Sequence, residues 1–212
     1  AWWQRSDALV MVDVSLSEDV AKRLASSGAR IVTIGCRTEP FSSVTLDEES
    51  AAAAAIRRLA DQGHRRIGVL TGEAVSAKFR VPMRRLDGVR QALRSAGIAL
   101  DPELECSGNF SIEGGAEAMA ALLSLDEPPT AVFSLSDEMA FGALGELRRR
   151  GLSVPDDVAV IGFDDHEMAE LLELTTVRQP VDRVGAMAAN LVLGAMKRRA
   201  APIEHQVAPT EL

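Results

Sequence analysis

Short, almost uninterrupted apolar runs recur along this 212-residue chain, and most of them are followed by a segment with helical spacing. The clearest runs are ALVMV (8–12), RIVTIG (30–35), HRRIGVLTG (64–72), TAVFSLS (130–136) and DVAVIGF (157–163). A strand that is buried on both faces has this pattern, because helices cover both sides of its sheet. The alternation therefore predicts an α/β fold in which parallel sheets are flanked by helices.

Two pairs of aspartates flank the last of these runs, in the stretch VPDDVAVIGFDD (154–165). In an open parallel sheet, ligands bind outside the carboxyl ends of the strands. The second pair, Asp164 and Asp165, follows the strand and is a candidate ligand contact. The first pair, Asp156 and Asp157, precedes the strand and is interpreted as a turn.

The composition weighs against a chain that itself binds nucleic acid and against one that spans a membrane. The chain has 31 acidic and 23 basic side chains and a net charge of −8, whereas phosphate contacts need clustered Lys and Arg. The basic triplets at 148–150 and 197–199 are predicted to lie at helix ends, where they complement the helix dipole. No apolar run has the roughly 18 residues that a membrane span needs. We therefore expect no membrane partner. Cys36 and Cys106 have no paired spacing, which favours a reducing, intracellular setting.

No enzyme motif emerges from the sequence. The three histidines are scattered and form no metal-binding spacing. GEAVSAK (72–78) ends in lysine but lacks the glycines that let backbone amides cradle a phosphate. We therefore expect no catalytic residues, no metal and no cofactor, and we do not interpret the chain as an enzyme.

Five segments together resemble the effector-binding domain of the LacI family of bacterial transcription regulators. They are GHRRIGVLTG (63–72), RLDGVRQAL (85–93), PTAVFSLSDEMAFGAL (129–144), GLSVPDDVAVIGFDD (151–165) and LTTVRQP (174–180). The resemblance implies a periplasmic-binding-protein-like fold of two α/β lobes, joined by three crossovers around a hinged cleft. By this analogy the N-terminal lobe takes 1–46 and 178–200, and the C-terminal lobe takes 47–177 and 201–212. It also implies that the chain is truncated at both ends, without the family's DNA-binding headpiece and first strands.

The same resemblance implies a function. A small-molecule effector, by family precedent a sugar or sugar derivative, would bind between the lobes of a cytoplasmic homodimer. It would control operator DNA only through the headpiece. The apolar positions of helices 16–28 and 51–62 would serve either the core or the dimer. The alternative reading is a periplasmic sugar-binding protein of a transporter, which shares the two-lobed fold.

The resemblance also selects site residues, each with a structural alternative. Asp164 matches the family's acidic ligand contact, and its carboxylate would accept hydrogen bonds from hydroxyl or ring N–H groups; otherwise it caps the following loop. Arg85 matches the arginine of an R-x-x-G signature; otherwise it forms a surface ion pair. Phe110 matches an aromatic that lies against the ligand, since a flat ring can stack on a sugar or a base; otherwise it packs in the core.

Four further residues are candidates by position. Ser136 and Asp137 stand where the family has an Asn-Asp pair, and Asp137 would otherwise satisfy the N-terminus of the following helix. Phe79 lies where some members carry a polar or basic ligand contact, and Arg37 follows the strand at 30–35. Asp165 is expected to be structural, and His166 is left open between the two roles.

Overall fold

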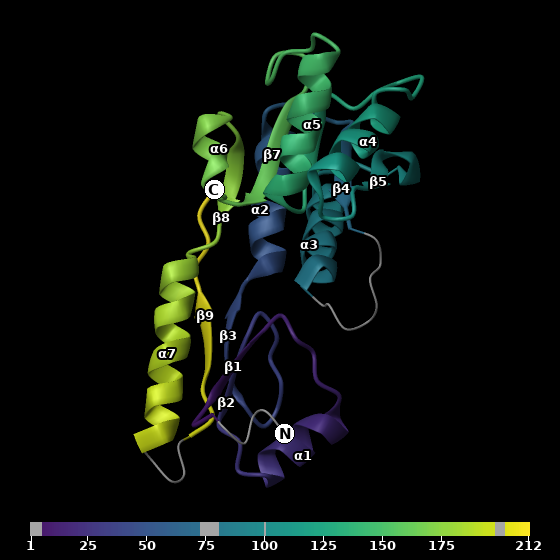
Figure 1. The fold of residues 1–212 in the computed structure, drawn as a ribbon. Coiled ribbons are helices and arrows are strands. Elements are labelled where there is room, and N and C mark those ends of the chain that lie inside the picture. Colours follow the sequence, from purple (N-terminus) through teal and green to yellow (C-terminus); the bar gives the residue numbers. More distant parts are fainter. Residues whose placement is uncertain (1–5, 73–80, 100, 198–201) are drawn as a thin grey trace. The chain divides into compact units, whose positions relative to one another are not determined.

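The structure, a computed structural model, describes residues 6–72, 81–99, 101–197 and 202–212 (Figure 1). These residues form two compact units. Unit 1 holds the described residues within 1–47, 76–81 and 180–209, and unit 2 those within 48–75, 82–179 and 210–212.

Unit 1 is built on a parallel sheet of four strands in the order β1-β2-β3-β9. The strands are β1 (Leu9–Val12), β2 (Ile31–Ile34), β3 (Ser42–Leu46) and β9 (His205–Ala208). Because β9 pairs with β3, residues 205–208 lie in unit 1, whereas the predicted division gave 201–212 to the second lobe.

The helices α1 (Glu18–Ser26) and α7 (Val181–Lys197) cover opposite faces of this sheet. Val184 and Ala188 of α7 pack on Val32 and Val44. On the other face, Ala21 of α1 packs with Ile31 and Phe41. Successive residues of a strand point to opposite faces, so Ile31 and Val32 serve different cores.

Unit 2 is built on a parallel sheet of five strands in the order β5-β4-β6-β7-β8. The strands are β4 (Ile67–Thr71), β5 (Glu105–Ser107), β6 (Ala131–Ser134), β7 (Ala159–Asp164) and β8 (Thr175–Arg178). The helices are α2 (Glu48–Asp61), α3 (Val81–Ser95), the 3₁₀ turn η2 (Pro102–Leu104), α4 (Ile112–Leu122), α5 (Asp137–Arg149) and α6 (Met168–Leu171). The predicted α/β fold with parallel sheets flanked by helices is confirmed.

The helices of unit 2 pack in two pairs, each at a glycine. A Cβ on Gly88 of α3 would lie 2.2 Å from the carbonyl oxygen of Glu49 in α2. A Cβ on Gly142 of α5 would lie 1.9 Å from the carbonyl oxygen of Ile112 in α4. The connection through α3 moves along the sheet in one direction and those through α4 and α5 in the other, so right-handed crossovers place the pairs on opposite faces.

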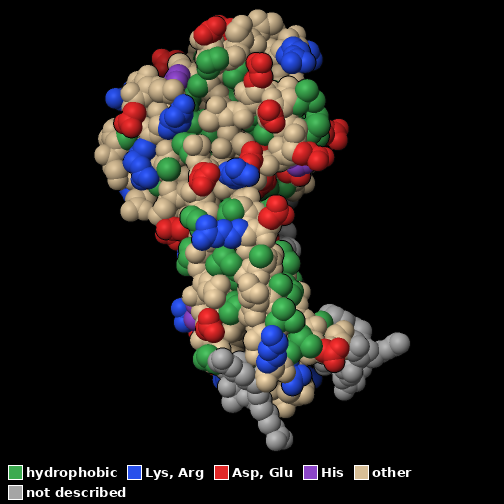
Figure 2. Space-filling view, turned by 90° about the vertical axis from the view of Figure 1, so that its left-hand side faces the viewer, with side chains coloured by type: hydrophobic (Ala, Val, Ile, Leu, Met, Phe, Trp, Pro, Cys, Tyr) green, Lys and Arg blue, Asp and Glu red, His purple; other side chains and the backbone are tan. Residues whose placement is uncertain are grey.

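Charged side chains of both signs are interspersed over unit 2 on the face shown in Figure 2. The basic triplet at 148–150 lies at the C-terminal end of α5, as predicted. Arg149 and Arg150 both bind the carboxylate of Glu146 at 2.7 Å, and these hydrogen bonds lower the pKa of Glu146 to about 2. Within the described part of the chain, no helix combines the length and the apolar character that a membrane crossing needs.

Candidate functional site

Most of the predicted site residues gather where the strands of the unit 2 sheet end. Thr71, Ser107, Ser134, Asp164 and Arg178 are the last residues of its five parallel strands, and parallel strands end at one edge. This carboxyl edge is where open parallel sheets bind ligands. The predicted residues on or next to it are Arg85, Phe110, Ser136, Asp137 and Asp164.

Arg85 reaches the edge from the first turns of α3 and is buried. Its Nε donates to Glu48 at 2.7 Å, and its Nη1 donates to the carbonyl oxygen of Leu135 at 2.6 Å. The guanidinium carbon lies 3.8 Å from the centre of the Phe163 ring, within the range of a cation–π contact. A longer contact of 3.4 Å joins Nη1 to Asp164. Arg85 is therefore not the exposed ion pair of the structural alternative, because its partner Glu48 is also buried.

Asp164 ends β7 with a side chain that is 29% exposed. Its Oδ1 accepts from Arg85 and from the amide of Gln179. Its φ of +135° lies in a region that residues other than glycine rarely adopt, and such strain clusters at ligand sites. Burial, with Asp137 and Glu138 nearby, raises the pKa of Asp164 to about 6, against the opposing effects of Arg85 and Gln179. The carboxyl group thus changes charge near neutral pH.

Asp137 is fully buried beside this edge and holds two segments together. It accepts from the backbone N–H of His166 at 2.8 Å and from the hydroxyl of Thr176 at 2.7 Å. A Cβ at position 162 would lie 2.2 Å from its Oδ1, so the glycine of the G-F-D signature leaves room for this carboxylate. Burial raises the pKa of Asp137. Its hydrogen bonds tie the loop after β7 to β8, and do not serve the start of α5.

Ser136 caps a helix, and Phe110 packs against the core. The Ser136 hydroxyl is buried and accepts from the N–H of Met139, so Ser136 is the N-cap of α5, as predicted. The Phe110 ring is half-buried against the unit 2 core and fills the space beside Gly72, which directly follows β4. Whether either residue also contacts a ligand remains a prediction.

The two remaining predicted site residues are not among those at the edge of the unit 2 sheet. Arg37 belongs to unit 1, where its Nε and Nη2 bind the carboxylate of Glu39 at 3.1 and 2.9 Å. Phe79 lies outside the described residues. Asp165 pairs with Arg178 at 3.2 Å, and the ring of His166 contacts that of Phe141.

Three residues of this network were not among the predicted site residues: Glu48, Thr176 and Gln179. Glu48 is the first residue of α2, and nothing in its local sequence marks it as the partner of Arg85. Thr176 and Gln179 lie in LTTVRQP, which was used as a family marker but supplied no predicted site residue. Among the residues described, no three His, Cys, Asp or Glu side chains are grouped so as to hold a metal ion.

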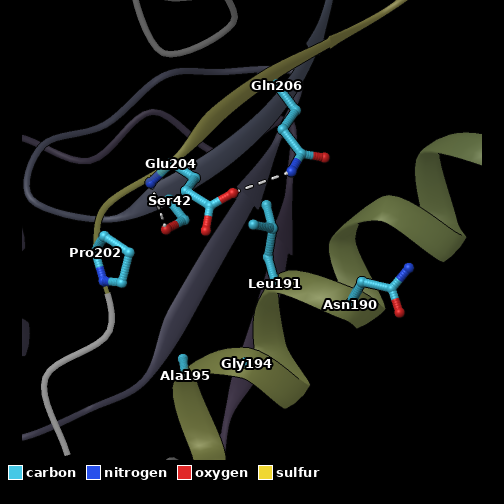
Figure 3. A pocket seen from close by; sticks show the side chains of 8 residues that line it. All are labelled: Ser42, Asn190, Leu191, Gly194, Ala195, Pro202, Glu204 and Gln206. Carbon is cyan, nitrogen blue, oxygen red and sulfur yellow. Dashed lines mark hydrogen bonds between the residues drawn. The ribbon is translucent and has the colours of Figure 1, made fainter. Parts of the chain in front are cut away.

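Unit 1 contains a pocket of its own (Figure 3). Ser42, Glu204 and Gln206 line it from the strand side, and Leu191 lines it from α7. Ser42 is the first residue of β3, so this pocket opens at the amino ends of the strands. Its polar groups already bind one another, since Glu204 N donates to Ser42 at 3.1 Å and Gln206 donates to Glu204 at 3.4 Å. The carboxyl edge of unit 2 is therefore the stronger candidate site.

Two parallel α/β units, one of which has polar side chains at the carboxyl edge of its sheet, are typical of small-molecule binding proteins. Residues 37–212 match the model of the periplasmic binding protein-like domain. The chain belongs to this family, in the branch of the LacI-type transcription regulators, and corresponds to their effector domain. The resemblance seen in the sequence is confirmed.

The relatives place the chain among regulators. It is 42% identical over 157 residues to the HTH-type transcriptional repressor CytR of Escherichia coli (strain K12), covering 73% of this chain and 45% of that protein. It is 31% identical to catabolite control protein A of Priestia megaterium, covering 91% of this chain and 58% of that protein. The chain thus spans about half the length of the curated relatives it matches.

Solved structures that are similar to this chain also belong to transcription regulators. A complex of the transcriptional regulator CelR with cellobiose has a TM-score of 0.86 and 32% identity, covering 98% of this chain and 64% of that one. A LacI family regulator from Enterococcus faecium with bound ribose has a TM-score of 0.88 and 27% identity, covering 98% and 78%. These matches favour the regulator over the transporter-type binding protein.

Proposed function

We propose that this chain senses a neutral, hydroxyl-rich small molecule, a sugar or sugar derivative, at the carboxyl edge of the unit 2 sheet. Binding would control a DNA-binding headpiece outside this chain, in the cytoplasm, and no chemical reaction would occur at the site. The observation that carries the proposal is the partly exposed carboxylate of Asp164 at the end of β7, beside buried Arg85. The relatives with cellobiose and ribose support a sugar.

The chemistry of the edge suits hydroxyl donors. An ionised carboxylate accepts hydrogen bonds from vicinal hydroxyls, and such charge-assisted bonds are stronger than neutral ones. Two donor nitrogens of Arg85 are already bound to Glu48 and the Leu135 carbonyl. We therefore assign Arg85 to supporting Asp164 and assign direct recognition to Asp164, with Phe110 as a ring on which the ligand stacks.

The first test is calorimetric titration with ribose, cellobiose and a panel of other sugars and nucleobases. For the compound that binds, Asp164→Asn should weaken binding by about tenfold or more, the usual value of a hydrogen bond to a charged group. Asp157→Asn is the matched control. Asp157 accepts from the N–H of Ser153 in the predicted turn, and its replacement should leave affinity unchanged.

The same titration should depend on pH. Because the pKa of Asp164 is raised to about 6, its carboxylate is largely protonated at pH 5 and ionised at pH 7. Affinity for a hydroxyl donor should therefore rise as pH increases from 5 to 7, and Asp164→Asn should remove this rise. A panel in which nothing binds at millimolar concentration, or equal affinity in wild type and Asp164→Asn, contradicts the proposal.

We also propose that the chain forms a homodimer through an apolar surface of unit 2. The apolar face of helix 51–62 is used in the core, since Ala52, Ala55 and Ile56 are buried. By contrast, Ile112, Met168 and Leu171 are large and exposed, and we call them the α6 patch. The start of α4 lies against α5, and Phe141 of α5 contacts His166 just before α6, which supports a continuous surface.

Leu171, which is 74% exposed, is the residue on which to test the α6 patch. Leu171→Glu should convert the dimer to a monomer in light scattering, because a buried charge in an apolar interface is costly. Leu193→Glu places the same change on an exposed leucine of α7 in unit 1 and should leave the dimer intact. A monomeric wild-type chain at high concentration, or dissociation by Leu193→Glu alone, contradicts this surface.

A further inference from the structure

The positive charge of Arg85 is already matched by a carboxylate inside the protein. Glu48, the first residue of α2, is only 3% exposed, and its Oε2 accepts from Nε of Arg85 at 2.7 Å. Nη1 of the same guanidinium donates to the carbonyl oxygen of Leu135 at 2.6 Å, and the ring of Phe163 lies against its central carbon. A buried ion pair of this kind is electrically neutral as a unit. Arg85 and Glu48 together therefore bring no net positive charge to the carboxyl edge of unit 2.

The remaining charges beside this pair are negative. Burial raises the pKa of Asp164 to about 6, and like charges on Asp137 and Glu138 add to this effect. Asp137 is fully buried, and the side chain of Asp164 is partly exposed at the end of β7. At neutral pH an acidic ligand group at this edge would meet carboxylates, and the cation that could attract it is neutralised by Glu48. Such like-charge contacts cost several kcal/mol and are a usual means of excluding a wrong ligand.

We propose that Glu48 determines the charge class of the effector: by matching the charge of Arg85, it restricts the site to sugars that carry no negative charge and excludes phosphorylated and acidic sugars. This inference rests on the proposed function and adds to it the class of sugar. Glu48 is buried and acts through Arg85, so it is a positioning residue that determines specificity without touching the ligand.

The first test needs no ligand and uses Glu48→Gln. Glutamine keeps an oxygen that can accept from Arg85 and removes the negative charge, so the edge gains one unit of positive charge. The titration midpoint of the Asp164 carboxyl, followed by NMR, should then move downward by about one pH unit, the effect of a nearby unit charge at an effective dielectric constant of about 20. A purely structural role of Glu48 would not move this midpoint.

Glu49→Gln is the matched control, because it makes the same change at the next residue of α2. Glu49 is 45% exposed and pairs with Arg84 at 3.4 Å, so solvent screens its charge and the Asp164 midpoint should stay in place. If Glu48→Gln shifts the midpoint no more than Glu49→Gln does, Glu48 does not control the charge of the edge, and the inference is overturned.

The second test is calorimetry with the sugar of the panel that binds wild type most tightly and with the phosphate ester of that sugar. Wild type should bind the ester about a hundredfold more weakly, and Glu48→Gln should narrow this difference about tenfold. If folded Glu48→Gln rejects the ester as strongly as wild type does, the exclusion is steric and the inference is overturned.

A third measurement on wild type alone separates charge from size. Raising the salt concentration from about 20 mM to about 500 mM should narrow the difference between sugar and ester at least roughly threefold, because salt screens repulsion between charges and leaves a steric clash unaffected. A difference that is independent of salt, or equal affinities for sugar and ester, contradicts the inference and leaves the proposed function in place. If no sugar binds wild type at all, the proposed function itself fails, and the inference with it.

Discussion

Replacing Arg85 by methionine should lower the free energy of unfolding by about 3–5 kcal/mol, the usual cost of removing one partner of a buried ion pair. Methionine fills similar space without charge. It leaves the carboxylate of Glu48 buried without a partner and the carbonyl oxygen of Leu135 without the donor at 2.6 Å. Both groups then carry the cost of desolvation without compensation. Urea unfolding monitored by circular dichroism measures the change.

The adjacent arginine provides the control. Arg84 binds Glu49 at 3.4 Å, and both side chains are 44–45% exposed, so Arg84→Met should cost no more than about 1 kcal/mol. A double variant, Arg85→Met with Glu48→Leu, should recover much of the loss, because the unpaired charge is removed with its partner. If Arg85→Met and Arg84→Met are equally stable, Arg85 does not have the structural role assigned here.

The strands that could be predicted from sequence are those whose side chains alone specify burial. DVAVIGF and TAVFSLS form β7 and β6, since a short, continuous apolar run is typical of a strand that is buried on both faces. Strands β5 (Glu105–Ser107) and β9 (His205–Ala208) were not predicted. Both are short, largely polar and at sheet edges, where pairing with β4 and β3 rather than local pattern decides the structure.

The residues of the candidate site could likewise be predicted from the sequence only in part. Asp164 and Arg85 could be selected from sequence because each stands in a short family signature, and the structure brings their side chains within 3.4 Å. Glu48 and Gln179 lie 37 residues before Arg85 and 15 residues after Asp164. Their importance depends on a fold that brings them together, and a single sequence does not show that. Asp137, the first residue of α5, was a candidate ligand contact with capping of that helix as the alternative. Its carboxylate accepts from His166 and Thr176, and Ser136 caps the helix.

The contact between α4 and α5 leads to the second large expected effect. These helices approach so closely that their backbones touch at glycines. A Cβ on Gly142 would lie 1.9 Å from the carbonyl oxygen of Ile112 and 2.6 Å from the backbone nitrogen of Ala116. Across the contact, a Cβ on Gly115 would lie 2.2 Å from the carbonyl oxygen of Met139. Backbone atoms cannot turn aside as a flexible side chain can, so any side chain here forces the helices apart.

Gly142→Ala should therefore lower the free energy of unfolding by about 2–3 kcal/mol, the cost of overpacking a close contact, even though alanine is the better helix former. Gly145, one turn further along the same helix, is the matched control. It is exposed, and a Cβ there would meet nothing within 4 Å. Gly145→Ala should raise the stability by about 0.5–1 kcal/mol, because only the helix preference of alanine remains. The same glycine-to-alanine change would then alter the stability in opposite directions at two positions three residues apart in one helix. The backbone contact of Gly142 with α4 accounts for that difference. If both variants are stabilised in thermal unfolding, the helices are not packed at Gly142.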